Sequence, residues 1–392
     1  MSNKIKLPEK KAVIYWPVGT GDSTTLVLKP KEVVMQIDLR HLEKSKDKEN
    51  PEWPIIDHLV DILPKKNKRP YLSVFVLTHP DKDHIQGFSE LLKKVDIGEL
   101  WHTPRIFRDQ KDQDSLCDDA KAFRKEADRR RKAILAAPDK VKSGDRLRII
   151  GHDDILKEDK YKDIPSAYKS RPGEIVTSVD GEELSADFQA FIHAPFKEDQ
   201  AKDRNKTSLA FNIKIINGKK CGQFFFFGDR EYTTIKKIFE KTEEKKKYIG
   251  FLSWDVMLAS HHCSKAVMYY KEEGDEKESF KKDIMDYFQK YSQSGTIVTS
   301  SLSEFSDGEG DNPPHKKARK RYEGIVKAGK FICTHEYPNK DNPEPFICTI
   351  DEKDGFGVEE KRKKEQGPAA LAAVVESARG HKQPPKVQIG QG

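Results

Sequence analysis

Residues 77–87 read Leu-Thr-His-Pro-Asp-Lys-Asp-His-Ile-Gln-Gly and carry four ligand-type side chains: His79, Asp81, Asp83 and His84. The apolar run Leu72–Leu77 predicts a buried strand before them, and apolar spacing from Phe88 to Val95 predicts an amphipathic helix after them. Imidazole and carboxylate together suit zinc, manganese or iron, and the lack of a thiolate argues against a closed structural zinc site. The alternative is a polar, N-capping loop with incidental histidines, but this density of ligand-type residues favours a metal site.

Further strands and helices are predicted on both sides of this stretch. Short β-branched runs broken by Gly and Pro predict strands at Val13–Trp16, Thr25–Leu28 and Val33–Asp38, and helical spacing predicts a helix within 51–63. Later strands are expected at Phe188–His193, Ser208–Ile216, Gln223–Phe227, Asp255–Ala259 and Thr296–Thr299, with charged helices at Tyr232–Lys247 and 277–290. Asp229 and the pair His261-His262 each follow a predicted strand, where loops gather and ligands are usually found.

Composition sets the expected domain organisation. The chain has 392 residues, of which 35% are hydrophobic and 35% charged, so we expect a modest core and a heavily charged surface. We predict one domain over residues 1–358, with a charged helical insertion at about 105–172. Polar, Gln/Pro/Gly-rich sequence then predicts a disordered tail at 359–392.

The five cysteines are far apart and form no C-x-x-C pair, which suggests neither a disulfide framework nor a zinc knuckle and fits a cytoplasmic protein. No apolar run is long enough to span a bilayer, so we expect no membrane partner.

The motifs together resemble the metallo-β-lactamase superfamily, in particular the hydrolase domain of ComEC-type DNA-uptake proteins. Residues 18–23 (VGTGDS) are similar to that family's V-G-x-G-D-[SA] opening, and residues 78–87 to its T-H-x-D-x-D-H-x-G loop. Residues 205–209 (NKTSL), 227–229 (FGD) and 261–265 (HHCSK) resemble its N-x-x-S-L, G-D and H-H-G-S-K motifs, and 312–315 (NPPH) a late Asn-to-His stretch. The resemblance implies an α+β fold, the αββα sandwich of two mixed sheets.

The resemblance also implies roles for individual residues. The implied metal ligands for one or two divalent ions, zinc or manganese, are His79, Asp81, Asp83, His84, Asp229 and His262. Asp83 and Asp229 are the expected catalytic residues, and the implied substrate-binding residues are Asn205, Ser208, Ser264, Lys265 and His315. The superfamily's separate third-motif histidine has no clear counterpart; His193 is a candidate, although a lone strand-end histidine is more often structural. Cys263 replaces a family glycine, which matters where that position needs a positive φ.

The sequence supports three hypotheses about function. The resemblance favours a phosphodiesterase or nuclease acting on nucleic acid or nucleotides, and basic clusters at 121–132 and 316–321 would suit phosphate backbones. Interleaved acidic residues leave a solvated helix face as the alternative for those clusters. The same site could hydrolyse esters, thioesters or lactams. The third reading is a non-catalytic, metal-stabilised regulatory module that docks on a protein partner through the insertion or the tail.

Overall fold

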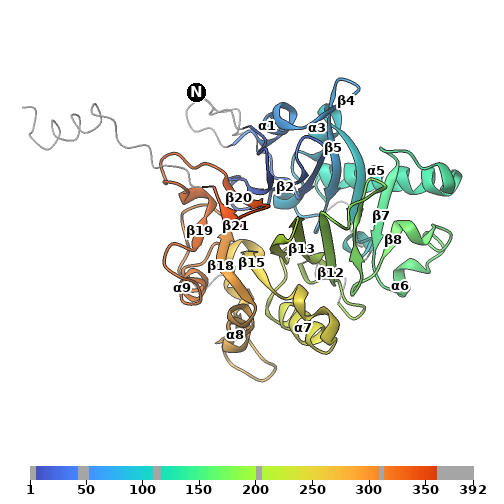
Figure 1. Cartoon of the computed structure of the whole chain (residues 1–392). Coiled ribbons are helices and arrows are strands. Elements are labelled where there is room, and N and C mark those ends of the chain that lie inside the picture. The colour runs from blue at the N-terminus through green and yellow to red at the C-terminus, as the bar shows by residue number, and fades with distance from the viewer. Residues whose placement is uncertain (1–5, 43–52, 109–115, 200–204, 309–312, 360–392) are drawn as a thin grey trace, which may run out of the picture. The chain divides into compact units, whose positions relative to one another are not determined.

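Two mixed β-sheets pack face to face and carry helices on their outer faces (Figure 1). The structure is a computed structural model that describes residues 6–42, 53–108, 116–199, 205–308 and 313–359. The predicted fold class, an α+β sandwich of two mixed sheets with outer helices, is therefore confirmed.

The first sheet has the strand order β21-β20-β1-β2-β3-β5-β6-β7-β8, with β4 paired to β5. Strands β3, β5, β6, β7 and β8 run parallel, whereas β21, β20, β1, β2 and β3 pair antiparallel. Their bounds are β1 Lys11–Tyr15, β2 Thr24–Lys29, β3 Val33–Ile37, β4 Lys65–Lys66, β5 Arg69–Val76, β6 Asp96–His102, β7 Arg146–Ile150, β8 Lys169–Ser170, β20 Phe346–Asp351 and β21 Gly355–Val358.

The second sheet has the order β19-β18-β15-β14-β13-β12-β9, with β14, β15, β18 and β19 parallel. Its strands are β9 Ile175–Val176, β12 Phe188–Ala194, β13 Ala210–Asn217, β14 Lys220–Phe226, β15 Trp254–Leu258, β18 Ser292–Thr299 and β19 Phe331–Cys333. Two small hairpins pair β10 Ser178–Val179 with β11 Glu182–Glu183, and β16 Tyr269–Tyr270 with β17 Ser279–Phe280.

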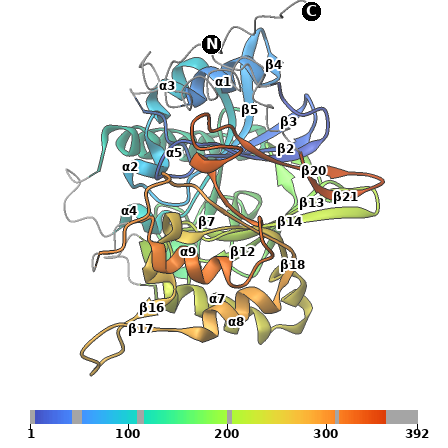
Figure 2. The ribbon, with the colours of Figure 1, turned by 90° about the vertical axis from the view of Figure 1, so that its left-hand side faces the viewer.

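The described helices are α1 Ile55–Ile62, α2 Lys82–Ile85, α3 Phe88–Lys94, α4 Arg105–Arg108, α5 Asp118–Ala136, α6 Asp153–Leu156, α7 Tyr232–Glu243, α8 Lys282–Lys290 and α9 Lys316–Glu323. Helices α1, α3 and α5 cover the first sheet, and α7, α8 and α9 cover the second (Figure 2).

Side-chain alternation along the strands produces these layers. In β1, Val13 and Tyr15 enter the core between the sheets, while Ala12 and Ile14 face the helices. In β14, Phe224 and Phe226 face inward and Phe225 faces α7. Because successive strand residues point to opposite faces, apolar residues at every position predict a strand buried on both sides.

The segment 105–172, predicted as a charged helical insertion, is partly built into the first sheet. It contains α5, as expected for its helical character, but β7 pairs in parallel with both β6 and β8 and extends the first sheet. Helix α5 is polar overall, yet Ala120, Phe123 and Ala127 recur at helical spacing and pack on the sheet. A narrow apolar stripe is enough to pack such a helix on a sheet. The average composition of the segment does not reveal this stripe.

No helix in the described part of the chain has the length and hydropathy needed to cross a bilayer. The predicted disordered tail at 359–392 lies, apart from Glu359, outside the described residues.

Candidate metal centre

The parallel strands of both sheets end at one edge of the sandwich, and the predicted ligands lie in the loops that follow them. His79 and Asp81 follow β5, while Asp83 and His84 lie in α2. Asp229 follows β14, and His261 and His262 follow β15. The carboxyl ends of parallel strands in facing sheets share an edge, and this arrangement brings residues far apart in the sequence into contact.

Asp229 lies at the centre of the cluster, with its two carboxylate oxygens facing different histidines. Oδ2 of Asp229 is 3.4 Å from His79 Nε2 and 3.7 Å from His261 Nε2. Oδ1 is 3.1 Å from His84 Nε2 and 3.7 Å from His262 Nε2. A single buried carboxylate therefore joins two groups of imidazoles.

Two further carboxylates complete the side of the cluster that contains His84 and His262. His262 Nε2 lies 3.2 Å from Asp83 Oδ2, and its Nδ1 lies 3.3 Å from Asp22 Oδ1. His84 Nε2 and His262 Nε2 are 3.1 Å apart. On the other side, Asp81 Oδ2 is 3.9 Å from His79 Nε2.

Asp38, at the end of β3, holds this arrangement from behind. His84 Nδ1 donates to Asp38 Oδ2 at 2.8 Å, which turns Nε2 of the same ring toward Asp229. Thr78 donates to both Asp38 oxygens, from its backbone N at 2.8 Å and its Oγ1 at 2.6 Å. Partners of this kind orient a ligand imidazole and set its tautomer.

The electrostatics of the cluster favour a cation. Burial disfavours the charged forms of His84 and His262, yet Asp229 and neighbouring carboxylates raise the pKa of His84 well above its usual value and that of His262 to about 10. Burial likewise opposes ionisation of Asp229, but the surrounding imidazoles, His84 first, hold its pKa well below the usual value. The raised pKa values show that the carboxylates create a strongly negative potential at the imidazole nitrogens. A bound divalent ion would neutralise that potential in place of the protons.

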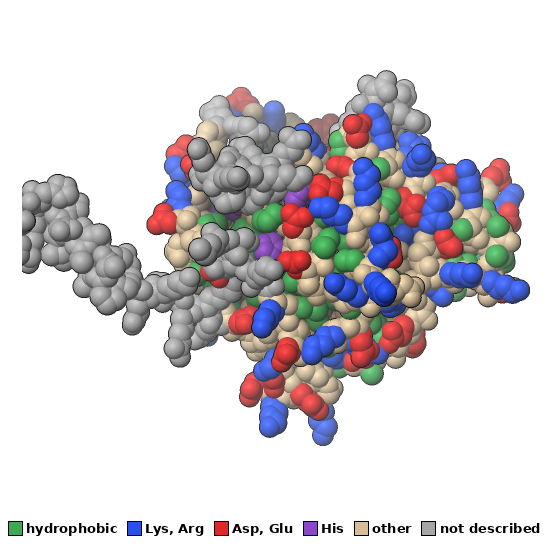
Figure 3. Space-filling view, turned by 90° about the horizontal axis from the view of Figure 1, so that it is seen from above, with side chains coloured by type: hydrophobic (Ala, Val, Ile, Leu, Met, Phe, Trp, Pro, Cys, Tyr) green, Lys and Arg blue, Asp and Glu red, His purple; other side chains and the backbone are tan. Residues whose placement is uncertain are grey.

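The donor set also fits a metal in its spacing. Two ligands that each lie about 2.0–2.2 Å from one ion are roughly 3–4 Å apart. The distances given above between the imidazole nitrogens and the oxygens of Asp22, Asp81, Asp83 and Asp229 run from 3.1 to 3.9 Å and fall in this range. His79 Nε2 is fully buried and makes no hydrogen bond within the described residues, although it points at Asp229. On the accessible side, the side chains of Asp83 and Asp81 are 35% and 29% exposed. Figure 3 shows histidine and acidic side chains together on one face of the molecule.

The backbone of the histidine pair is unusual. His261, His262 and Cys263 all have positive φ, at 50°, 50° and 68°. Cys263, the residue that replaces a family glycine, thus adopts the left-handed conformation in which glycine is preferred. Hydrogen bonds hold the turn: Ser260 Oγ donates to Gly228 O, and the Cys263 carbonyl accepts from His315 N at 3.1 Å. Strain of this kind persists at functional sites because the surroundings over-determine it.

The predicted substrate-binding residues are less directly placed. Lys265 is buried and paired with Glu278 at 2.7 Å, and Ser264 Oγ accepts from Ala266 N. His315 caps α9 through Nδ1, and its Nε2 lies 3.0 Å from Gly308 O. These three polar groups make contacts within the protein, and their role in substrate binding stays a prediction.

Ser208 lies beside the metal loop, close to Gly228. Leu209 N donates to the carbonyl of Thr78, which places the residue after Ser208 beside the metal loop. The Ser208 Oγ is buried and has no hydrogen-bond partner in the described part of the chain. Asn205 begins the short 3-10 turn in front of it.

His193 does not belong to the cluster. Its ring lies 3.1 Å from both Thr242 Oγ1 and Phe251 O and packs against Phe225 on the helix-covered outer face. Burial lowers the pKa of His193 to about 3. The structural reading of this histidine is therefore correct, because strand alternation turns it away from the inner edge.

Asp22 and His261 were not among the predicted ligands, yet both lie in the cluster. Asp22 is in the turn between β1 and β2, and its backbone N donates to Asp83 O at 3.0 Å. A carboxylate directly after G-x-G was the available signal for Asp22. For His261 the signal was the adjacent histidine, because αL backbone at both positions lets neighbouring side chains face one centre.

Gly228 offers a test of how tightly the site is built. Its φ is +56°, and a Cβ there would lie 2.8 Å from Ser208 Cβ and 3.3 Å from Thr78 Cβ. We expect Gly228→Ala to lower the free energy of unfolding by about 2–4 kcal/mol, since overpacking adds to left-handed strain. Chemical denaturation measures this loss.

The matched control is Gly329→Ala, because Gly329 has φ +78° and no atom lies within 4 Å of the place that a methyl group would take. That change should cost only the conformational strain, roughly 1–2 kcal/mol. Equal losses for the two variants would show that the approach of Ser208 to Gly228 is not sterically tight.

Neither a protein-family model nor a curated protein matches the sequence. Among solved structures, the chain is similar to YhfI, a metallo-β-lactamase fold protein from Bacillus subtilis, at 12% identity over 86% of this chain and 99% of YhfI, with a TM-score of 0.38. It is also similar to a diphosphatase of the PhnP family, at 9% identity over 87% and 98% of the two chains (TM-score 0.36). A third similar structure is BJP-1, a subclass B3 metallo-β-lactamase of Bradyrhizobium japonicum. It is 13% identical over 64% of this chain and 75% of BJP-1, with a TM-score of 0.33. Two of these three structures, YhfI and BJP-1, are thus a metallo-β-lactamase fold protein and a metallo-β-lactamase. The resemblance of this chain to ComEC-type proteins stays a prediction.

Proposed function

We propose that this protein is a metal-dependent hydrolase of phosphodiesters, a phosphodiesterase or nuclease. The observation that carries the proposal is the convergence of buried imidazoles and carboxylates on the two oxygens of Asp229. Such a donor set at the open edge of a sandwich suits a catalytic site better than a closed structural one, because part of the cluster stays exposed.

The residues divide into two sets that would hold two zinc or manganese ions. His79, Asp81 and His261 lie on the Oδ2 side of Asp229, whereas Asp22, Asp83, His84 and His262 lie on its Oδ1 side. The two sets adjoin, because ligand atoms of His79, Asp83 and His84 also lie within 4.8 Å of one another. Asp229 would bridge them. When bound, divalent ions supply Lewis acidity and lower the pKa of a coordinated water.

Asp83 is the residue best placed to act on an attacking water. Burial opposes its ionisation, but the hydrogen bond with His262 and the charge of His84 hold its pKa well below the usual value. An ionised, partly exposed carboxylate can accept a hydrogen bond from water and orient its lone pair. Asp38 acts indirectly, by fixing the ring of His84.

The position and the positive charge of helix α9 support a phosphodiester substrate. His315 N donates to Cys263 O, so α9 begins one residue after a hydrogen bond to the histidine turn. The exposed residues of α9 include Lys317, Lys320 and Lys316, whose Nζ pairs with the exposed Asp307 at 2.7 Å. Cations so close to a metal site can contact the phosphates that flank a scissile bond.

The proposal is tested by turnover on a substrate panel. Purified protein supplied with Mn²⁺ or Zn²⁺ should hydrolyse bis-p-nitrophenyl phosphate or a short oligonucleotide, and p-nitrophenyl acetate and nitrocefin should be poorer substrates. Turnover of the ester or lactam without any diester hydrolysis would overturn the phosphodiester assignment and favour the broader hydrolase reading. Tight metal binding without turnover of any substrate would favour a non-catalytic module.

Charge reversal on α9 separates backbone binding from chemistry. Lys316→Glu/Lys317→Glu should raise KM for an oligonucleotide about tenfold or more at low salt and leave a small diester nearly unchanged, because lost phosphate contacts weaken polymers selectively. The matched control reverses Lys65 and Lys66, which are exposed in β4. These pair with the start of β5, an eight-residue strand whose far end leads to His79, a separation of roughly 25 Å. Equal losses on polymer and small diester would contradict a distal role for α9.

A further inference from the structure

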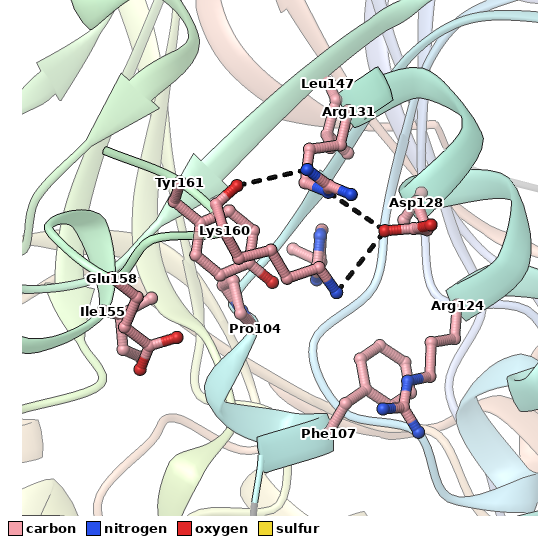
Figure 4. Close-up of a pocket in the computed structure, with 12 residues that line it drawn as sticks. Pro104, Phe107, Arg124, Asp128, Arg131, Leu147, Ile155, Glu158, Lys160 and Tyr161 are labelled. Atoms are coloured by element: carbon pink, nitrogen blue, oxygen red, sulfur yellow. Dashed lines mark hydrogen bonds and ion pairs between the residues drawn. The ribbon is translucent and has the colours of Figure 1, made fainter. Parts of the chain in front are cut away.

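A second candidate site lies between α5 and the segment 155–161. It is a cavity of about 200 Å³. The walls come from α4, α5, β7 and the turn that ends at Tyr161 (Figure 4). No residue of the metal cluster lines it, so it is distinct from the site described above.

Apolar and aromatic groups form much of the lining. Phe107, Tyr161, Leu147 and Ile155 line the cavity together with Ala127 of α5. An apolar cavity of roughly 150 Å³ holds benzene, so this volume accommodates one substituted six-membered ring and excludes a dinucleotide. Flat aromatic walls favour a planar occupant.

His102, at the end of β6, gives the cavity a buried polar group. Its side chain is 4% exposed, and Nδ1 has no hydrogen-bond partner in the described part of the chain. Burial holds the pKa of His102 at about 4, so the ring is neutral near pH 7. Leaving such a nitrogen unpaired costs about 1–3 kcal/mol, and a hydroxyl or ring nitrogen of a bound molecule could satisfy it.

The rim carries both charges, with Arg124, Arg131 and Lys160 against Asp128 and Glu158, and so one positive charge in excess. Arg131 and Lys160 are engaged with Asp128, at 3.0 and 3.5 Å. Arg124 forms no ion pair within the described residues; its guanidinium lies 5.9 Å from the centre of the Phe107 ring (Figure 4). A guanidinium matches a carboxylate in a two-pronged hydrogen bond.

We propose that this cavity binds a monocyclic aromatic carboxylate, with the ring between Phe107 and Tyr161, a ring substituent at His102 and the carboxylate at Arg124. The proposal is independent of the proposed hydrolase function, because it concerns a different set of residues. It also predicts which features of the ligand matter: ring, charge and one hydrogen-bonding substituent.

Titration calorimetry on the full chain tests the proposal with five probes. We expect saturable binding of 4-hydroxybenzoate, binding about tenfold weaker for the uncharged 4-hydroxybenzamide and for 4-methylbenzoate, and none for acetate. Orotate in place of 4-hydroxybenzoate distinguishes a heteroaromatic acid from a phenolic one. Failure of every aromatic acid to bind at millimolar concentration would overturn the proposal.

Variants locate the binding. Arg124→Ala should weaken 4-hydroxybenzoate about tenfold or more, whereas Lys125→Ala, an exposed neighbour on α5 outside the lining, should leave the affinity unchanged. Ala127→Leu should fill the cavity and abolish binding. Unchanged affinity in a folded Ala127→Leu variant would refute the location.

A spectroscopic readout on the wild-type protein avoids dependence on a folded variant. The ring resonances of His102 should shift on addition of 4-hydroxybenzoate, while those of His193, equally buried but engaged on both nitrogens, should not. Equal shifts, or no shift at His102, would place the ligand elsewhere.

Discussion

Asp229→Asn should reduce diester turnover by at least about a hundredfold, because loss of an outer-shell partner alone commonly costs 10–100-fold and Asp229 faces both ligand sets directly. The substitution keeps the size of the side chain but removes the charge that lowers the repulsion among four nearby imidazoles. It should also reduce the bound metal from two ions to one or fewer. Initial rates and metal analysis after gel filtration measure the two effects.

The matched control is Asp275→Asn, the same substitution at an exposed position in the hairpin between β16 and β17. Both measurements should stay at wild-type values there. Full metal content and near-full turnover in Asp229→Asn would show that this carboxylate does not bridge ions, and would remove the main support for the two-ion arrangement.

Removal of metal should abolish turnover and lower the melting temperature by several degrees. An ion that binds only the folded state stabilises it by about 4 kcal/mol when its free concentration is 1,000 times Kd. In the metal-free protein the protonated imidazoles of His84 and His262 offset only part of the repulsion among Asp22, Asp83 and Asp229. Differential scanning calorimetry before and after EDTA treatment, followed by addition of Mn²⁺ or Zn²⁺, measures the loss and its recovery.

Asp229→Asn controls for unspecific effects of the chelator. Its melting temperature should respond much less to EDTA, because the variant has lost much of its metal affinity. An equal response in wild type and variant would mean that EDTA acts at some other place. Turnover that persists in metal-free protein would exclude a metal-dependent mechanism.

Local pattern was sufficient for many of the elements. The predicted strands at Val33–Asp38 and Leu72–Leu77 correspond to β3 and β5, and the helix from Phe88 corresponds to α3. Each contains enough apolar residues at one period to specify its structure without a partner. The ligand-type residues at 79–84 are also local, since one loop carries them.

Other features depended on segments far apart in the chain. Strand β20 pairs with β1, which brings Ile350 opposite Lys11, and no local pattern announces a partner more than 300 residues away. The polar average composition of α5 predicts an insertion. A few apolar residues on one face nevertheless pack the helix on the first sheet.

The sequence by itself therefore determined most of the residues that could bind a metal and the strand ends that carry them. Only the tertiary structure decided which residues meet. It places Asp22 and His261 in the cluster and His193 outside it. The physical reason is that strand alternation and sheet pairing set the direction of a side chain, whereas ligand chemistry alone sets only its suitability.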